Sequence, residues 1–289
     1  MSDTPSGNTS GALPGPVHRG ITSIGRFTQQ RLQQGAAGAR YVGGAVYLLH
    51  DTIVWALRGL FTRRVKFGAP ALAAQMVRVG VRSIAIVVLV QVFIGMILAL
   101  QLAPTLETYG QLERVADVVG IAVVRELGPL LTAIVLSGFA GASIAAELGA
   151  MVEAEEIKAL RAHALDPVRF LVVPRLLATA SMIVVLTVIA DFVGVFGGFV
   201  TAVLVLDVPS FLYISLTQEA LVTMDFFTGL VKAAVFGVII AMIACYEGLH
   251  VTGGAEGVGR ATTATVVKSI VALIGIDAMF TSVFYVLEI

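Results

Sequence analysis

Three ionisable side chains stand inside otherwise apolar stretches of the sequence: Asp191, Lys232 and Asp277. Within a membrane such groups usually face a helix-bundle interior or a water-filled cavity, where they line a polar passage or form a structural ion pair. Because an unpaired charge there costs about 2.5 to 3.5 kcal/mol, we expect Lys232 to pair with Asp191 or Asp277. Arg125 and Glu126 lie near the end of their apolar stretch, so we expect them to reach the membrane interface.

A glycine-rich sequence, Gly253 to Arg260, has the composition of a phosphate-binding loop but not its chemistry. Such a loop needs Lys followed by Ser or Thr after its last glycine, and a strand before it. Here Arg260 and Ala261 follow the last glycine, and an apolar stretch precedes the loop. We therefore predict a tight turn, with Thr262 or Thr263 capping the next helix.

The remaining reactive side chains form no catalytic or metal-binding pattern. The four histidines are scattered outside the clear apolar stretches, and the single cysteine, Cys245, lies within one. A lone cysteine in such a stretch is most simply a small buried hydrophobic residue. We therefore predict no catalytic site, no metal site and no cofactor. The net charge of zero gives no reason to expect a nucleic-acid partner.

A short, strongly charged segment at about 150–166 separates two apolar stretches. Ile157 and Leu160 are three positions apart and would share one face of a helix. The segment ends at Asp166, because the residue before a proline disfavours helix. We predict a surface helix to which a partner could bind and so move the membrane domain. The alternative is a solvated connecting loop. The candidate contact residues are Glu153, Glu155, Glu156, Ile157, Leu160 and Arg161.

The elements that hold these residues are membrane helices. The chain of 289 residues is 57% hydrophobic and 13% charged, whereas a soluble domain carries about 25% charged residues. We predict an all-α polytopic membrane protein with five spans. The expected spans are Ser83–Leu106, Leu127–Ala146, Leu176–Leu206, Phe226–Tyr246 and Ser269–Leu287, with polar loops between the last three.

Two features of these spans are open to interpretation. The second span is expected to start near Val118 and to kink at Gly128 and Pro129. Its small residues at every fourth position form a stripe on which another helix can pack closely, namely Ser137, Gly141, Ala145 and Gly149. The third span is long enough to be either one tilted helix or two short segments broken at its glycines.

The N-terminal part is more polar than the rest. Residues 1–40 are expected to form a disordered or weakly helical cytoplasmic tail, and residues 41–289 a single membrane domain. Within that domain, 41–61 fits an amphipathic helix lying in the headgroup region, and the alternative is a further span.

The distribution of Lys and Arg predicts the orientation. Basic residues cluster at 58–82, at 158–175, and at Arg260 and Lys268, whereas the loop at 207–225 has none. Cytoplasmic loops carry the excess of basic residues. The two groups alternate only if 176–206 crosses once, which places the N-terminus in the cytoplasm, the C-terminus outside, and the charged segment at 150–166 in the cytoplasm.

Two long sequence blocks resemble a known family. The first reads ELGPLLTAIVLSG, AAELGAM and EEIKALRAHALDPVRFLVVPRLLA, from Glu126 to Ala178, and the second is GGAEGVGRATTATVVKSIVALIGIDAMFTSVFY, from Gly253 to Tyr285. Both resemble the MlaE/YrbE-type permeases of lipid ABC transporters associated with MCE-domain proteins. The resemblance covers about Leu72 to Tyr285.

The resemblance implies a homodimeric or pseudo-symmetric permease of the bacterial inner membrane that carries phospholipid or another lipid. It also implies a separate cytoplasmic ABC ATPase, an MCE-domain protein in the periplasm and a small STAS-domain partner. The segment matching Glu153–Leu165 would be the coupling helix that contacts the ATPase. One position departs from the family pattern, since Phe139 stands where a basic residue is usual. From the residues alone, an ion-coupled secondary transporter using Asp191, Lys232 and Asp277 and a noncatalytic membrane scaffold remain alternatives.

Overall fold

The computed structural model describes residues 38–58 and 69–287. The chain divides into two compact units, Met1–Tyr47 and Leu48–Ile289. In the described part of the first unit the chain is helical, and this helix continues to residue 58. The expected tail at 1–40 and the end of the expected helix at 41–61 fall largely outside the described residues. All five candidate spans belong to the second unit.

Every regular element of the described residues is helical, and five of the helical stretches are long and apolar enough to cross a membrane. This confirms the predicted all-α polytopic membrane protein. The five candidate spans are Pro70–Thr108, Leu112–Glu153, Val168–Leu204, Thr223–Leu249 and Gly254–Val286.

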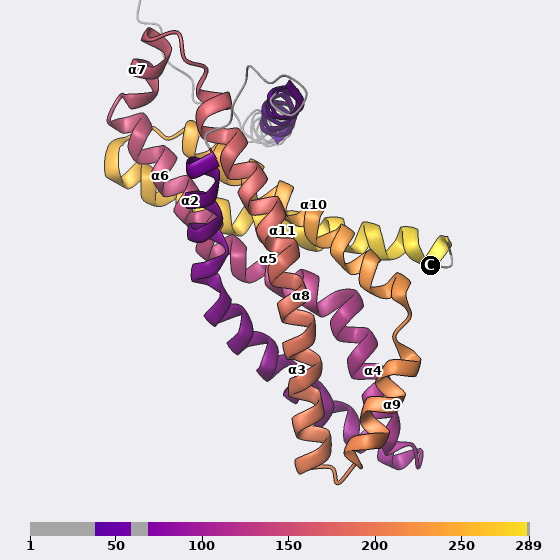
Figure 1. Ribbon diagram of the computed structural model, residues 1–289. Helices are drawn as coiled ribbons and strands as arrows, with labels where there is room; N and C mark the ends of the chain where they lie inside the picture. Colours follow the sequence, from indigo (N-terminus) through magenta and orange to yellow (C-terminus); the bar gives the residue numbers. More distant parts are fainter. Residues whose placement is uncertain (1–37, 59–68, 288–289) are drawn as a thin grey trace, which may run out of the picture. The chain divides into compact units, whose positions relative to one another are not determined.

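The first two spans are interrupted helices (Figure 1). In the first, α2 leads through the short turn η1 into α3; their bounds are α2 Ala69–Val79, η1 Val81–Ser83 and α3 Ile84–Thr108. In the second, two wide π-helical turns, η3 and η4, separate three α-helices. The bounds are η2 Leu112–Arg114, α4 Val115–Ala122, η3 Val123–Leu127, α5 Gly128–Leu136, η4 Ser137–Gly141 and α6 Ala142–Glu153.

The remaining elements complete the chain from α6 to its C-terminal end. The short helix α7 leads back to the membrane through the π-helical turn η5, and α9 lies between the third and fourth spans. The bounds are α7 Glu156–Ala162, η5 Val168–Val172, α8 Val173–Leu204, α9 Ser210–Ala220, α10 Thr223–Leu249 and α11 Gly254–Val286.

The third span is one continuous helix, α8, so its glycines do not break it. They instead allow α3 to pack backbone to backbone along α8. A Cβ at Gly95 would stand 1.9 Å from the carbonyl oxygen of Gly194, and one at Gly197 would stand 2.3 Å from that of Val92. The α3–α8 contact is the most extensive between any two described elements, and the two helices run alongside each other in Figure 1.

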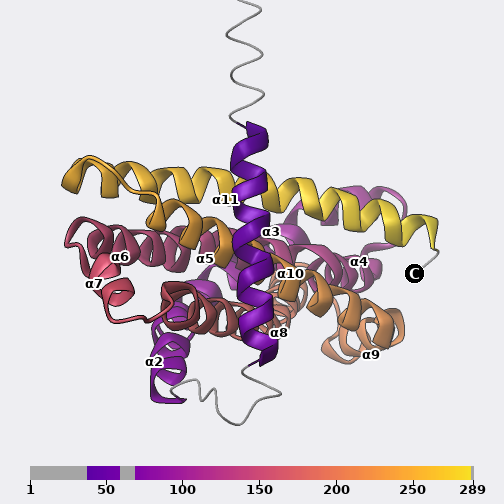
Figure 2. The same cartoon turned by 90° about the horizontal axis from the view of Figure 1, so that it is seen from above.

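Helix α8 also packs against α10, and α10 packs in turn against α11 and α6. Figure 2 shows this order from above, with α10 lying between α11 and α8. The expected small-residue stripe of the second span is the contact face. A Cβ on Gly141 would touch Ile240 of α10 at 3.2 Å, and one on Gly149 would lie 2.8 Å from Val251 in the α10–α11 connection.

Three sequence-based boundaries were wrong. The loop expected between the last two spans is short, because α10 continues to Leu249 and α11 begins at Gly254, after Gly253 makes the turn at φ 95°. Thr262 and Thr263 therefore lie inside α11, where both hydroxyls donate to the carbonyl of Gly259 instead of capping the helix. The acidic loop expected at 207–225 contains helix α9, which is only 11 residues long and therefore too short to stand out as a span.

Candidate functional site

A polar network joins three helices in the otherwise apolar interior. The Lys232 side chain on α10 is fully buried, and its Nζ lies 2.6 Å from Oε2 of Glu126 and 3.2 Å from Oδ1 of Asp277. Nζ also donates to the hydroxyl of Thr281 at 3.1 Å, and that hydroxyl donates to Oε1 of Glu126 at 3.2 Å. The ring of Phe284 covers the ammonium group at 5.7 Å. The expected pairing of Lys232 with Asp277 is therefore present, together with a partner that we had not expected.

The unexpected partner, Glu126, is placed by the wide turn η3. Pro129 has no N–H, so it cannot donate to the carbonyl four residues earlier, and the α-helix is interrupted just before it. A π-helical turn at this point rotates the chain relative to a regular helix. The sequence indicated no partner for Glu126 within the bundle, whereas its side chain turns toward α10 and pairs with Lys232. The signal in the sequence was the Gly-Pro pair directly after Glu126-Leu127.

Asp191 lies apart from this network. The residue is 3% exposed, and neither of its carboxyl oxygens has a hydrogen-bond partner among the described residues. The carboxyl faces the start of α5, where a Cβ on Gly128 would stand 1.8 Å from Oδ1. The amide of Gln91 on α3 donates to the carbonyls of Leu127 and Gly128 at 3.4 Å each. Lys232 thus pairs with Asp277, and Asp191 is not its partner.

A second ion-pair network, which we did not predict, lies at the other end of the bundle. Glu147 at the end of the second span accepts from Arg78 of α2 and from Arg175 of α8, with Arg175 Nη2 3.1 Å from Oε1. Arg175 is only 4% exposed and also donates to the carbonyl of Leu171 at 2.8 Å. This network ties together three helices that flank the charged segment. Each of these charged residues stands at the end of a different apolar stretch, so the sequence gives no indication that they pair.

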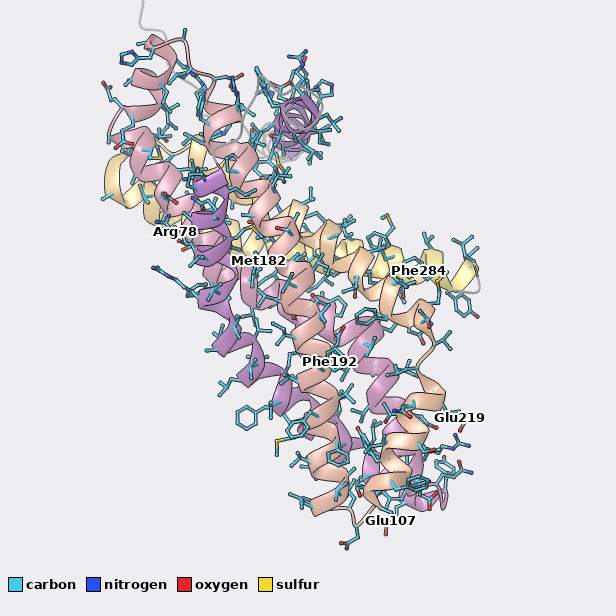
Figure 3. All side chains as sticks on the ribbon, in the orientation of Figure 1. Arg78, Glu107, Met182, Phe192, Glu219 and Phe284 are labelled. Atoms are coloured by element: carbon cyan, nitrogen blue, oxygen red, sulfur yellow. The ribbon has the colours of Figure 1, made fainter. Side chains whose placement is uncertain are left out.

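The position that departs from the family pattern borders this network. Phe139, in η4, is 44% exposed and lines a pocket of about 500 Å³ together with Arg78, Arg82 and Ser143. The pocket therefore has basic side chains from α2 and η1, although position 139 itself carries none. Figure 3 labels Arg78, which projects from α2.

The coupling segment, Glu153–Leu165, is a single short helix between two tight turns. The chain leaves α6 through Ala154 and Glu155, and Glu155 adopts the left-handed conformation with φ 59°. Helix α7 covers only the centre of the segment, which is shorter than the helix expected from the sequence. The Lys158 ammonium lies 2.6 Å from the Glu155 carboxylate, and this hydrogen bond holds the pKa of Glu155 below its usual value.

The two apolar residues of this segment differ in their exposure to solvent. Ile157 is 8% exposed and packs within its own chain, so it holds α7 in place and is not free to fill a groove on a partner. Leu160 is half-buried, and Glu156 and Arg161 are exposed. Asp166 fixes the segment's end, because its carboxylate accepts from the backbone N–H of Val168 at 2.9 Å.

The indole of Trp55 also donates to Asp166, at 2.9 Å. Asp166 thus links the turn before η5 to a second part of the same unit. The coupling segment is therefore anchored at its base and has an exposed charged face. Among the described residues, no cluster of three or more His, Cys, Asp or Glu side chains could hold a metal ion.

Comparison with known proteins identifies the family. The model of the Permease MlaE family matches residues 72–283. A probable ABC transporter permease protein of Rickettsia prowazekii is 37% identical over 211 residues, which are 73% of this chain and 82% of that protein. A probable ABC transporter permease protein of Synechocystis sp. is 37% identical over 229 residues, 79% of this chain and 85% of that protein. The intermembrane phospholipid transport system permease protein MlaE of Haemophilus influenzae is 33% identical over 217 residues, 75% and 83% of the two chains. The chain belongs to the MlaE permease family.

Proposed function

We propose that this chain is the membrane-spanning permease subunit of an ATP-driven lipid transporter, with phospholipid as the substrate class. The observation that carries the proposal is the family match, which runs through all five candidate spans and includes the coupling segment. The relative from Haemophilus influenzae is named for intermembrane phospholipid transport. The relatives from Rickettsia and Synechocystis are named as ABC transporter permeases.

The energy for transport would come from a separate cytoplasmic ABC ATPase that docks on the coupling segment. The exposed face of this segment offers Glu156 and Arg161 for orientation and the half-buried Leu160 as an apolar anchor. Leu165, 37% exposed in the turn after α7, adds a second apolar contact. Buried apolar anchors usually dominate such interfaces, whereas rim charges set the association rate. Glu153 and Glu155 would lie at the rim.

The charges at the two ends of the bundle support an N-in, C-out orientation in the bacterial inner membrane. Arg78 lies toward one end, and Glu107 and Glu219 lie toward the other (Figure 3). The loop with α9 holds acidic residues and no Lys or Arg. Since cytoplasmic loops carry the basic excess, the α9 end would face the periplasm and the coupling segment the cytoplasm.

The other partners are those that the family resemblance implies. A second copy of this chain would complete the permease, and α11 has the most surface left for it, because only 11% of its apolar window is buried within the chain. Val267, Val271 and Ile274 form an exposed apolar stripe on that helix. An MCE-domain protein would bind on the periplasmic side, and a STAS-domain protein would join the cytoplasmic assembly.

The test is purification of the tagged chain from its own host. We expect an ABC ATPase and an MCE-domain protein to co-purify, and extraction of the complex to give enriched phospholipid. The matched variant Glu156→Lys with Leu160→Asp should lose the ATPase and stay folded in the membrane. Purification without any ATPase, together with transport driven by an ion gradient, would instead support the secondary-transporter alternative.

A further inference from the structure

A pocket of about 240 Å³ lies on α8, and none of its lining residues belongs to the Lys232 network or to the coupling segment. Its walls are apolar and come from η3, α8 and the ends of α9 and α10. They include Val124, Phe192, Leu221 and Phe226. Two polar side chains, Asp191 and Thr217, also line it, and both are more than nine-tenths buried. An apolar cavity with a few convergent polar groups is the usual form of a small-molecule site.

Asp191 sets the chemistry of this pocket. Both carboxyl oxygens lack a hydrogen-bond partner among the described residues, although the group is almost fully buried. Burying such a group without partners is costly. The guanidinium of Arg125, which follows the wall residue Val124 in η3, lies 3.2 Å from the carboxylate of Asp225 and pairs with that acid. A ligand would therefore have to bring the hydrogen-bond donors for Asp191, and a cationic donor would complement the Asp191 carboxylate best.

The pocket opens on the surface of the chain, near one end of α10. Phe192, labelled in Figure 3, is 72% exposed and Val222 is 61% exposed, so both stand at its mouth. Val222 directly precedes α10, which places the pocket where the chain leaves its apolar span. Headgroups of membrane amphiphiles lie at that level. A neighbouring apolar pocket of about 320 Å³ shares Phe192, Val195 and Thr217, and this gives an alkyl chain room to continue.

We propose that this pocket binds a membrane amphiphile whose primary ammonium group pairs with Asp191 and whose alkyl chain runs along Phe192 and Phe196. The site is separate from the proposed transport function, because it needs neither the ATPase nor a second copy. Acidic amphiphiles should be excluded, since a carboxylate would meet the unpaired oxygens of Asp191. Simple alcohols should bind more weakly, because they supply a neutral donor.

The test uses the purified chain and tryptophan quenching. Trp55 is the only tryptophan, so Phe192→Trp in a Trp55→Phe background places a single reporter at the mouth. The probes are 11-bromoundecylamine, 11-bromoundecanol and 11-bromoundecanoate. Leu89→Trp in the same background is the matched control, since Leu89 is exposed on α3, which contributes no residue to the pocket, and it corrects for partitioning into detergent.

After that correction, we expect the amine to quench at about tenfold lower concentration than the alcohol, and the acid not to bind. Asp191→Asn should remove the preference for the amine. If Asp191→Asn does not fold, Leu221→Trp in the Trp55→Phe background, with Phe192 unchanged, takes its place. The new tryptophan should fill the pocket, so the three probes should then quench its fluorescence at equal concentrations. Equal quenching by all three probes, or an amine preference that survives Asp191→Asn, would overturn the proposal.

Discussion

Replacing Lys232 by methionine tests the buried network most sharply. The ammonium group is fully buried and is the shared partner of Glu126 and Asp277, at 2.6 and 3.2 Å. Without it, two carboxyl groups would face each other in an apolar interior with no cation between them. Removing one partner of a buried ion pair costs about 3 to 5 kcal/mol, which is on the order of 10 °C in melting temperature. Thermal unfolding of the purified protein in detergent measures the loss.

The rescue variant makes the prediction specific. Adding Asp277→Asn to Lys232→Met removes one of the two stranded carboxylates, so we expect about half of the lost stability to return. Asp207→Asn is the matched control, because Asp207 is exposed in the connection after α8 and lies outside the network. The reasoning is refuted if Lys232→Met melts like the wild type, or if Asp207→Asn rescues it as well as Asp277→Asn does.

Three further predictions concern packing, topology and coupling. Gly95→Ala should destabilise the protein by about 1 to 3 kcal/mol, because its Cβ would stand 1.9 Å from the carbonyl oxygen of Gly194. Gly275→Ala on α11, whose Cβ would have no neighbour within 4 Å, should not destabilise it. Thermal unfolding of both variants checks this. Cysteines at positions 210 and 288 in a Cys245→Ser background should both react with a periplasmic thiol reagent, and labelling of only one would contradict the five-span orientation. Glu156→Lys with Leu160→Asp should abolish co-purification of the ATPase, while Lys158→Ala, which removes only the pair with Glu155, should leave it unchanged.

The five spans could be predicted because membrane helices need long apolar runs, and these are visible in one sequence. The bounds of shorter elements could not. Helix α9 is only 11 residues long, and α11 begins among glycines that would suit a turn in another context. The local sequence at α9 and at the start of α11 does not show whether the chain forms a helix or a loop there. The glycines of α8 left two alternatives open in the sequence, one helix or two short segments, because their role is set by the approach of α3.

The candidate site was predicted in part. The position of Lys232 within an apolar run required an acidic partner, and Asp277 is one. Which acids are near it depends on how the helices rotate, and the wide turn η3 rotates Glu126 into the network while Asp191 faces elsewhere. The Arg78–Glu147–Arg175 network joins three distant parts of the chain and has no local signal. Likewise, the burial of Ile157 depends on how α7 folds back on its own chain.

The most direct test of the central claim is lipid transfer in proteoliposomes that contain the purified complex. We predict ATP-dependent movement of a fluorescent phospholipid between the complex and acceptor vesicles, abolished by Glu156→Lys with Leu160→Asp and retained in Lys158→Ala. Transfer that proceeds at the same rate without ATP, or that is unchanged in the double variant, would contradict the assignment of this chain as the permease of an ATP-driven lipid transporter coupled through α7.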